Sequence, residues 1–225
     1  MMDLSTSIAA SALLMGASIV AALAAGSISR LVKTWVGGED DVLSAHAIAV
    51  SPVSRWLAGI IVGALTIGFY IASGATADAW TLVFFVMLLL AIGLVDLETT
   101  FIPDLLSVPL LLGAIAFSPF SEGPYDGAIG AFMGWGAMAA TFLAVSARRR
   151  EMTYSGGDAL LAGAGGAIVG AAGVPPFLFL AGILMLIVFS LPDARDRRIP
   201  WGPIICISIA LTAATDLGAF FRVQA

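Results

Sequence analysis

The chain has 225 residues, of which 60% are hydrophobic and only 11% are charged, and its net charge is −5. Because soluble domains carry about 25% charged residues, a soluble fold could not bury this much apolar surface. The dilute negative charge provides no basic surface, so we expect no nucleic-acid partner. We therefore expect an integral membrane protein whose main surroundings are lipid.

Metal and disulfide chemistry are disfavoured by the cysteine and histidine content. The chain has one cysteine, Cys206, which lies in an apolar run, and one histidine, His46, which lies in a polar segment. These two residues are too few and too far apart in sequence for a thiolate cluster or a disulfide framework. We expect neither a metal site nor a cofactor.

Apolar runs that can cross a bilayer, or nearly do so, follow one another along the chain. A transmembrane helix needs about 20 such residues. The runs lie at residues 7–28, 56–75, 79–97, 104–120, 125–146, 158–173, 176–191 and 201–221. They predict an all-α fold, a polytopic membrane helix bundle of about eight transmembrane helices that forms a single domain over residues 1–225. Pro175-Pro176 predicts a tight turn between the sixth and seventh runs.

The basic residues set the expected orientation, because positively charged loops stay in the cytoplasm. All but Arg222 fall into three loops on one side: Arg30, Lys33 and Arg55; Arg148, Arg149 and Arg150; and Arg195, Arg197 and Arg198. This predicts that both termini are extracytoplasmic. The first of these loops, residues 29–55, is expected to be a short, irregular cytoplasmic segment.

Two acidic residues lie at the edge of the expected hydrocarbon layer. Asp96 ends one apolar run and Asp158 begins another. Ionisable groups at such depth usually face a bundle interior or an aqueous cavity. Two crossings separate them, so both carboxylates are expected at the cytoplasmic face.

A pair of close carboxylates suits the hydrolysis of a peptide bond. Two carboxylates in a partly desolvated pocket cannot both ionise readily, so one retains its proton. The ionised member can then accept a proton from the attacking water while the protonated member donates to the peptide carbonyl. Asp96 and Asp158 are therefore candidate catalytic residues of an aspartyl protease.

Three short motifs resemble those of the type IV prepilin peptidases, which are intramembrane aspartyl proteases of the GxGD type. Residues 96–109, DLETTFIPDLLSVP, resemble the first family signature, residues 155–158, SGGD, resemble the second, and residues 197–205, RRIPWGPII, resemble a segment at the start of the last helix. The motifs occur in the family's order. The resemblance covers residues 85–215, which we expect to form the peptidase core.

The resemblance implies a function and a set of site residues. Asp96 and Asp158 would be the catalytic pair, supported by Pro103, Asp104, Gly156 and Gly157. The enzyme would lie in the bacterial inner membrane and cleave the basic leader from prepilin or pseudopilin precursors. Asp104 also suits the N-terminus of a helix, and Glu98 and Asp104 could attract the basic leader.

The chain also departs from the family pattern. Ser155 replaces a glycine of the second signature, and Leu160 replaces a lysine. Residues 29–55 contain no cysteine, so the family's metal-binding motifs are absent and the N-methyltransferase activity of many relatives is not expected.

Two other functions remain open on the sequence. A proton- or cation-coupled transporter would use the two aspartates for ion binding, and it would favour broken helices with repeat symmetry. A degenerate relative would bind pilins without cleaving them.

Downstream of the second signature, Ala162, Gly166 and Gly170 form a small-residue face that predicts close helix packing.

Overall fold

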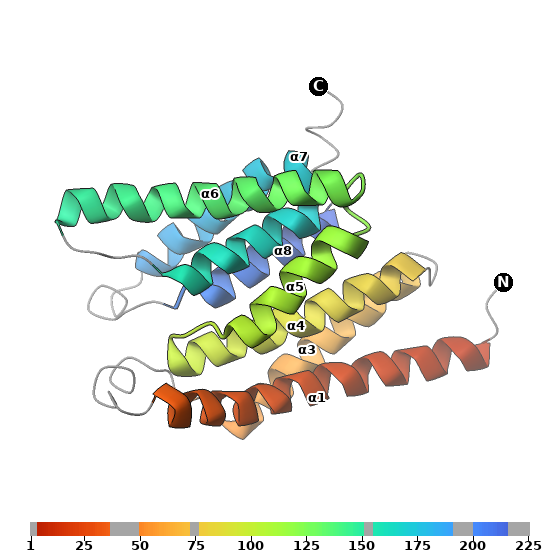
Figure 1. Cartoon of the computed structure of the whole chain (residues 1–225). Coiled ribbons are helices and arrows are strands. Elements are labelled where there is room, and N and C mark those ends of the chain that lie inside the picture. Colours follow the sequence, from red (N-terminus) through yellow and green to blue (C-terminus); the bar gives the residue numbers. More distant parts are fainter. Residues whose placement is uncertain (1–3, 37–49, 73–76, 151–154, 191–199, 216–225) are drawn as a thin grey trace. The chain divides into compact units, whose positions relative to one another are not determined.

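The computed structural model describes residues 4–36, 50–72, 77–150, 155–190 and 200–215, and the regular structure in these ranges is entirely helical (Figure 1). The helices are α1 (Leu4–Val36), α3 (Pro52–Ala72), α4 (Ala77–Thr99), α5 (Asp104–Phe117), α6 (Pro124–Arg149), α7 (Gly156–Phe189) and α8 (Gly202–Thr215). The all-α class is therefore confirmed. The described ranges contain seven helices instead of the expected eight, because two of the expected spans lie within α7.

The distribution of apolar side chains indicates a membrane protein. Among the residues that the structure describes, three helical stretches are long and apolar enough to cross a membrane, namely Ala10–Trp35, Pro124–Arg148 and Gly156–Phe189. Leu105 is 77% exposed, although it lies on one of the most apolar helices, and the Ser107 side chain two residues later is fully buried. Large apolar surfaces of this kind are unfavourable in water, whereas lipid is a suitable solvent for them.

The chain forms two compact units, Met1–Thr100 and Phe101–Ala225, which we call the first unit and the second unit. In the first unit, α1 packs against both α3 and α4. Glycines allow α3 to approach α1 closely. An added Cβ would lie 2.9 Å from the Cα of Ile19 at Gly59, and 2.7 Å from the Sδ of Met15 at Gly63. Small residues four positions apart commonly form such contacts between membrane helices.

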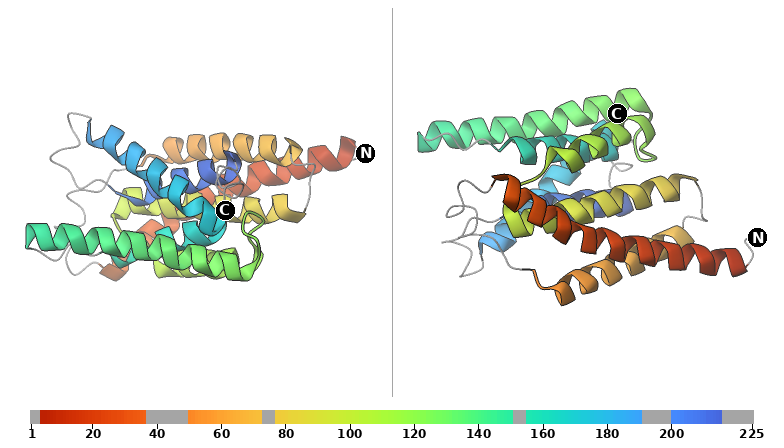
Figure 2. Two further views of the ribbon diagram at one scale, coloured as in Figure 1. Left: turned by 90° about the horizontal axis from the view of Figure 1, so that it is seen from above. Right: turned by 60° about the horizontal axis from the view of Figure 1, so that its bottom comes forward.

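In the second unit, α7 packs against α5, α6 and α8 (Figure 2). The backbones of α6 and α7 are close enough that a Cβ at Gly130 would overlap the carbonyl of Gly166, and a Cβ at Gly134 would overlap that of Ala162. A Cβ at Gly170 would overlap a side chain from the first turn of α6. The predicted small-residue face of α7 is therefore confirmed as a packing face.

The α7 helix consists of two segments that fold back on one another at Gly170. This residue has φ 70° and ψ 171°, which no helical residue adopts. An added Cβ at Gly165 would lie 3.1 Å from the ring of Phe177, and one at Gly166 would lie 3.3 Å from Val174. Twelve residues of straight helix span about 18 Å, so these contacts require the chain to reverse its direction.

The C-cap residue of α5 and a side chain of α6 bond two backbone groups that the reversal leaves without helical partners. The hydroxyl of Ser118, at the end of α5, donates to the carbonyl of Ile168 at 2.5 Å. The backbone N–H of Ala171 donates to Oδ1 of Asp126 at 3.1 Å, and that of Glu122 donates to Oδ2 at 3.0 Å. Unpaired backbone groups cost several kcal/mol in lipid, so these bonds make a turn possible within an apolar helix.

The turn is thus present as expected but occurs at a different residue. The sequence placed it at Pro175-Pro176, whereas the backbone breaks at Gly170 and both prolines lie inside the second helical segment. Proline has a helix-compatible φ, and inside a helix it removes a hydrogen bond and crowds the carbonyl four residues earlier, which kinks the helix without reversing it. The reversal instead needs a positive φ, which glycine adopts without steric cost.

The expected irregular loop over residues 29–55 is shorter than predicted at both ends. Helix α1 continues to Val36, and α3 begins at Pro52. The first apolar run ends at residue 28, but backbone hydrogen bonding does not require lipid, and Lys33 stabilises the last turn of α1 through the helix dipole. Residues 37–49, including His46, lie outside the described residues.

Candidate active site

Asp96 lies in the last turn of α4, in the first unit. Its carbonyl accepts a 2.7 Å hydrogen bond from the N–H of Thr100, the residue that follows the helix. Thr100 has φ 51°, a left-handed conformation that is unusual for a β-branched residue. Backbone strain of this kind often occurs at functional sites and persists only where the surroundings stabilise it.

The end of α4 carries several buried polar side chains. Asp96 is only 3% exposed, and Glu98 and Thr99 are also buried. The Thr99 hydroxyl donates to the carbonyl of Val95 at 2.7 Å. Polar groups in such a place need hydrogen-bond or ion-pair partners to be tolerated, and Asp96 takes part in a polar interaction of its own.

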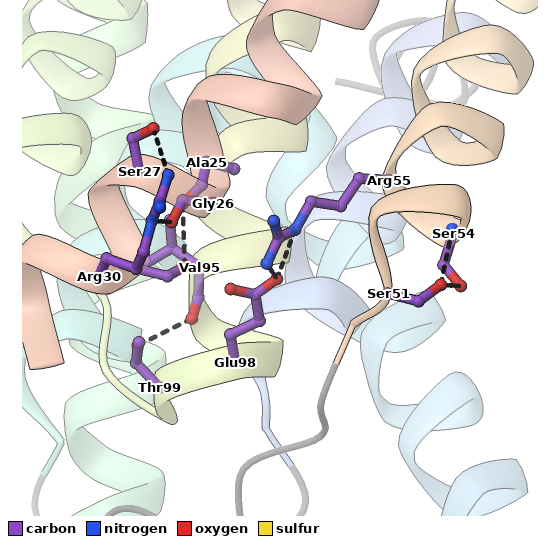
Figure 3. A network of polar contacts seen from close by, with 11 residues as sticks. Ala25, Gly26, Ser27, Arg30, Ser51, Ser54, Arg55, Val95, Glu98 and Thr99 are labelled. Atoms are coloured by element: carbon purple, nitrogen blue, oxygen red, sulfur yellow. Dashed lines mark hydrogen bonds and ion pairs between the residues drawn. The ribbon is translucent and has the colours of Figure 1, made fainter.

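Glu98 forms an ion pair with Arg55, at the start of α3 (Figure 3). The Nε of Arg55 donates to Oε1 of Glu98 at 2.8 Å, and Nη2 lies 2.5 Å from the same oxygen. The sequence offered Glu98 as one of two acids that could attract a basic leader, whereas its charge is buried and paired with Arg55.

The second unit begins with the remainder of the first signature. Pro103 is buried and stands immediately before α5, and Asp104 is the first residue of that helix. Asp104 is exposed. Its carboxylate therefore lies near the positive end of the helix dipole, where an anion is favourable, as the sequence predicted.

Asp158 lies in the first turn of α7 and is 8% exposed. Ser155 is the N-cap of this helix, and its Oγ accepts a hydrogen bond from the N–H of Asp158 at 3.5 Å. Ser155 is one of the departures from the family pattern, and it supplies a cap that glycine has no side chain to provide. Leu160, the other departure, is half-buried.

The two signatures meet at Gly157 within the second unit. A Cβ at this position would lie 2.9 Å from the Cβ and 3.1 Å from the carbonyl oxygen of Ile102. Ile102 directly precedes Pro103, so the segment before α5 packs against the first turn of α7. Gly156, the neighbouring signature glycine, is exposed.

Two features of the structure were missed by the sequence analysis. The Arg55–Glu98 pair joins residues that are 43 positions apart, and the Asp126–Ala171 bond joins residues 45 positions apart. Neither spacing has a periodic signal. The one available clue was that Asp126 follows a proline at the start of a helix, a position typical of acids that interact with backbone N–H groups.

Within the described ranges, no three histidine, cysteine, aspartate or glutamate side chains come together as a possible metal site.

The helical fold and the lipid-compatible surface define a helical membrane protein. Residues 83–191 match the model of the Type IV leader peptidase family, so the resemblance stated from the first two motifs is confirmed. The matched range contains both Asp96 and Asp158, whereas the third motif, residues 197–205, lies beyond it. Searches of curated proteins and of solved structures found no match.

Proposed function

We propose that this protein is a prepilin leader peptidase of the bacterial inner membrane. It would cleave the basic leader from type IV pilin-like or pseudopilin precursors at the cytoplasmic face, with Asp96 and Asp158 as the catalytic pair. The observation that carries the proposal is the family match over residues 83–191, which includes both aspartates within their signatures.

The proposed chemistry is the addition of water to one peptide bond. The ionised aspartate accepts a proton from water as the water oxygen bonds to the carbonyl carbon, and the protonated aspartate donates its proton to the carbonyl oxygen. The tetrahedral intermediate then collapses as its carbon–nitrogen bond breaks. The first aspartate gives its proton to the departing amine, and the second recovers a proton from the new carboxyl group. No cofactor is needed.

Local geometry supports the choice of these two residues. Each aspartate is buried at a helix end that carries its signature. Asp96 is connected by only five residues, 97–101, to Ile102, which packs against Gly157 beside Asp158. Buried carboxylates at helix ends are suited to exchange protons with a bound substrate.

One structural feature, a broken helix, agrees with the transporter alternative, but the contacts around the break explain it without ion transport. It favoured broken helices, and α7 is broken at Gly170. However, Ser118 and Asp126 already bond backbone groups on either side of the break. The break therefore forms part of a packed turn. It also lies within residues 83–191, which match a family of peptidases. We retain the peptidase as the proposed function.

The test is a cleavage assay in which the chain is co-expressed with a prepilin. We expect the wild-type chain to shorten the prepilin by its leader, and the Asp96→Asn and Asp158→Asn variants each to lower the rate at least about 100-fold, because each removes an acid–base group. Mass spectrometry of the product gives the cleavage site. We expect the new N-terminus to carry no methyl group.

Two matched controls separate catalysis from general loss of charge. Asp104→Asn changes an exposed signature acid outside the proposed pair, and Glu122→Gln changes an exposed acid outside the signatures. Glu122→Gln should retain most of the activity, and Asp104→Asn should lower it less than either pair variant does. If either pair variant processes the prepilin at the wild-type rate, the catalytic assignment is wrong. Binding of prepilin by a wild-type chain that does not cleave it would instead identify a degenerate relative.

A further inference from the structure

We propose that Arg55 is a positioning residue for Asp96, and that it acts by holding Glu98, two residues further along α4. This inference rests on the proposed role of Asp96 as one of the catalytic pair. It adds a function for a residue outside the matched family segment, since Arg55 precedes residue 83. All of the contacts involved lie within the first unit.

The geometry of the pair favours a fixed position over a mobile surface contact. Two nitrogens of Arg55 contact the same oxygen of Glu98, and the side chains are only 20% and 5% exposed respectively. A planar guanidinium with two contacts restricts the carboxylate more than a lysine would. Exposed ion pairs contribute little, but breaking a buried pair leaves an uncompensated charge in an apolar environment.

The backbone that carries Arg55 is held by hydrogen bonds at the start of α3. Ser51 precedes Pro52 at the start of α3, and its Oγ accepts the N–H of Ser54 at 3.1 Å. The N–H of Arg55 donates to the carbonyl of Ser51 at 3.1 Å. Arg55 therefore extends from a capped helix start to the end of α4.

Helix α1 leaves a passage for this side chain at Gly26. A Cβ at Gly26 would overlap the Nη1 of Arg55, so even alanine would require the guanidinium to move. Arg30 approaches the same residue from the α1 side, since its Nε donates to the Gly26 carbonyl at 3.3 Å and its Nη2 donates to Ser27 at 3.3 Å (Figure 3). The absence of a side chain at Gly26 thus allows the pair to form.

The end of α4 needs a contact that opposes fraying. The helix ends at Thr99, one turn after Asp96, and the next residue, Thr100, has an unfavourable positive φ. Helix ends tend to fray, and a strained residue increases that tendency unless surrounding contacts oppose it. The ion pair fixes Glu98 within this turn, and therefore also fixes the backbone that carries Asp96.

The experiment uses a substitution that displaces Arg55 without removing a charge. Gly26→Leu should push the guanidinium away from Glu98, and Gly16→Leu is the matched control, because it makes the same change on the same helix where nothing lies within 4 Å. Arg55→Gln and the reversal Arg55→Glu/Glu98→Arg complete the set. The first readout is kcat and KM for prepilin cleavage. The second is the alkylation rate of the Asp96→Cys chain, in a Cys206→Ala background, with and without each change.

The expected pattern distinguishes positioning from substrate binding. Gly26→Leu and Arg55→Gln should lower kcat by about 10- to 100-fold with KM within about twofold, because misplacement of a catalytic group by about 1 Å has effects of this size. Both should also accelerate alkylation at position 96. The reversal should recover part of each effect, and Gly16→Leu should cause neither.

Three outcomes would overturn the proposal. Unchanged kcat and alkylation in Gly26→Leu and Arg55→Gln would show that the pair does not position Asp96. A change confined to KM would make Arg55 a substrate contact. Equal effects of Gly16→Leu and Gly26→Leu would show that the space at Gly26 does not determine the position of Arg55. If the wild-type chain cleaves no prepilin, the proposed function fails, and the alkylation rates alone then decide whether Arg55 positions residue 96.

Discussion

At the scale of single residues, Gly157 shows how a missing side chain can bring two motifs together. Ile102 from the first signature occupies the space that a Cβ of residue 157 would take. Asp158 is adjacent in sequence, and its N–H is directed to the Ser155 hydroxyl. The first turn of α7 is therefore defined by a contact on one side and a cap on the other.

Gly157→Ala should weaken this contact and lower activity. The new methyl group would meet both the Cβ and the backbone of Ile102, and overpacking of this kind costs about 1–3 kcal/mol. We expect a lower thermal unfolding temperature in detergent and slower prepilin cleavage, each measured against the wild-type chain.

Gly136→Ala is the matched control for that change. It lies on α6, and its added Cβ would find nothing within 4 Å. Because alanine is a better helix former than glycine, this variant should be as stable as the wild-type chain or more stable. Equal destabilisation by the two substitutions would show that the Ile102 contact has no special importance.

The sequence predicted the positions of individual residues where the cause was local. Asp104 was placed at a helix start because the proline before it cannot continue a preceding helix and the dipole favours an acid there. Glu98 was misinterpreted because its burial depends on Arg55, which belongs to another helix. No pattern in the neighbourhood of Glu98 contains that information.

At the scale of elements, the reversal in α7 depends on Gly170 and on Asp126. Gly170→Ala should destabilise the second unit by about 1–3 kcal/mol, since its backbone conformation is essentially restricted to glycine.

Asp126→Ala should cost a similar amount, about 1–3 kcal/mol, because the N–H groups of Ala171 and Glu122 lose their acceptor. Thermal unfolding in detergent measures both losses.

Two further variants locate the turn and identify the interaction that stabilises it. Asp126→Asn keeps one acceptor oxygen and should be less harmful than Asp126→Ala. Pro175→Ala changes an exposed residue within the second helical segment and should have little effect. If Pro175→Ala destabilises the chain as much as Gly170→Ala, the prolines contribute to the turn as the sequence analysis supposed.

Apolar runs predicted the existence of the helices better than their ends. Each described helix overlaps an expected span because an apolar run of that length is rarely anything but a helix in lipid. Helix ends follow from backbone bonding instead, which extends α1 to Val36 and leaves Arg150, with φ 57°, just after α6. Several glycines lie between Gly163 and Gly173, so sequence alone did not distinguish the one that turns the chain.

At the scale of the whole molecule, the distribution of basic residues predicts which ends of the helices face the cytoplasm. Tyr125 is exposed at the start of α6, and Arg148 is exposed near its end. In a Cys206→Ala background, we expect an impermeant maleimide to label the Tyr125→Cys chain in intact cells, and to label the Arg148→Cys chain only after permeabilisation.

A double variant provides the control for that labelling. The Tyr125→Cys/Arg148→Cys chain should incorporate one label in intact cells and two after permeabilisation. Labelling of both positions from the outside of intact cells would contradict the predicted crossing by α6. Labelling of Arg148→Cys alone would reverse the predicted orientation and move the proposed site away from the cytoplasmic face.

The turn at Gly170 also has a consequence for the order in which the chain is made. Both of its polar partners, Ser118 and Asp126, precede it in the sequence. A ribosome therefore synthesises the acceptor and the hydroxyl before the backbone groups that need them, and the hairpin can close as soon as it emerges. A partner located downstream would leave those groups exposed to lipid during insertion, at a cost of several kcal/mol for each group.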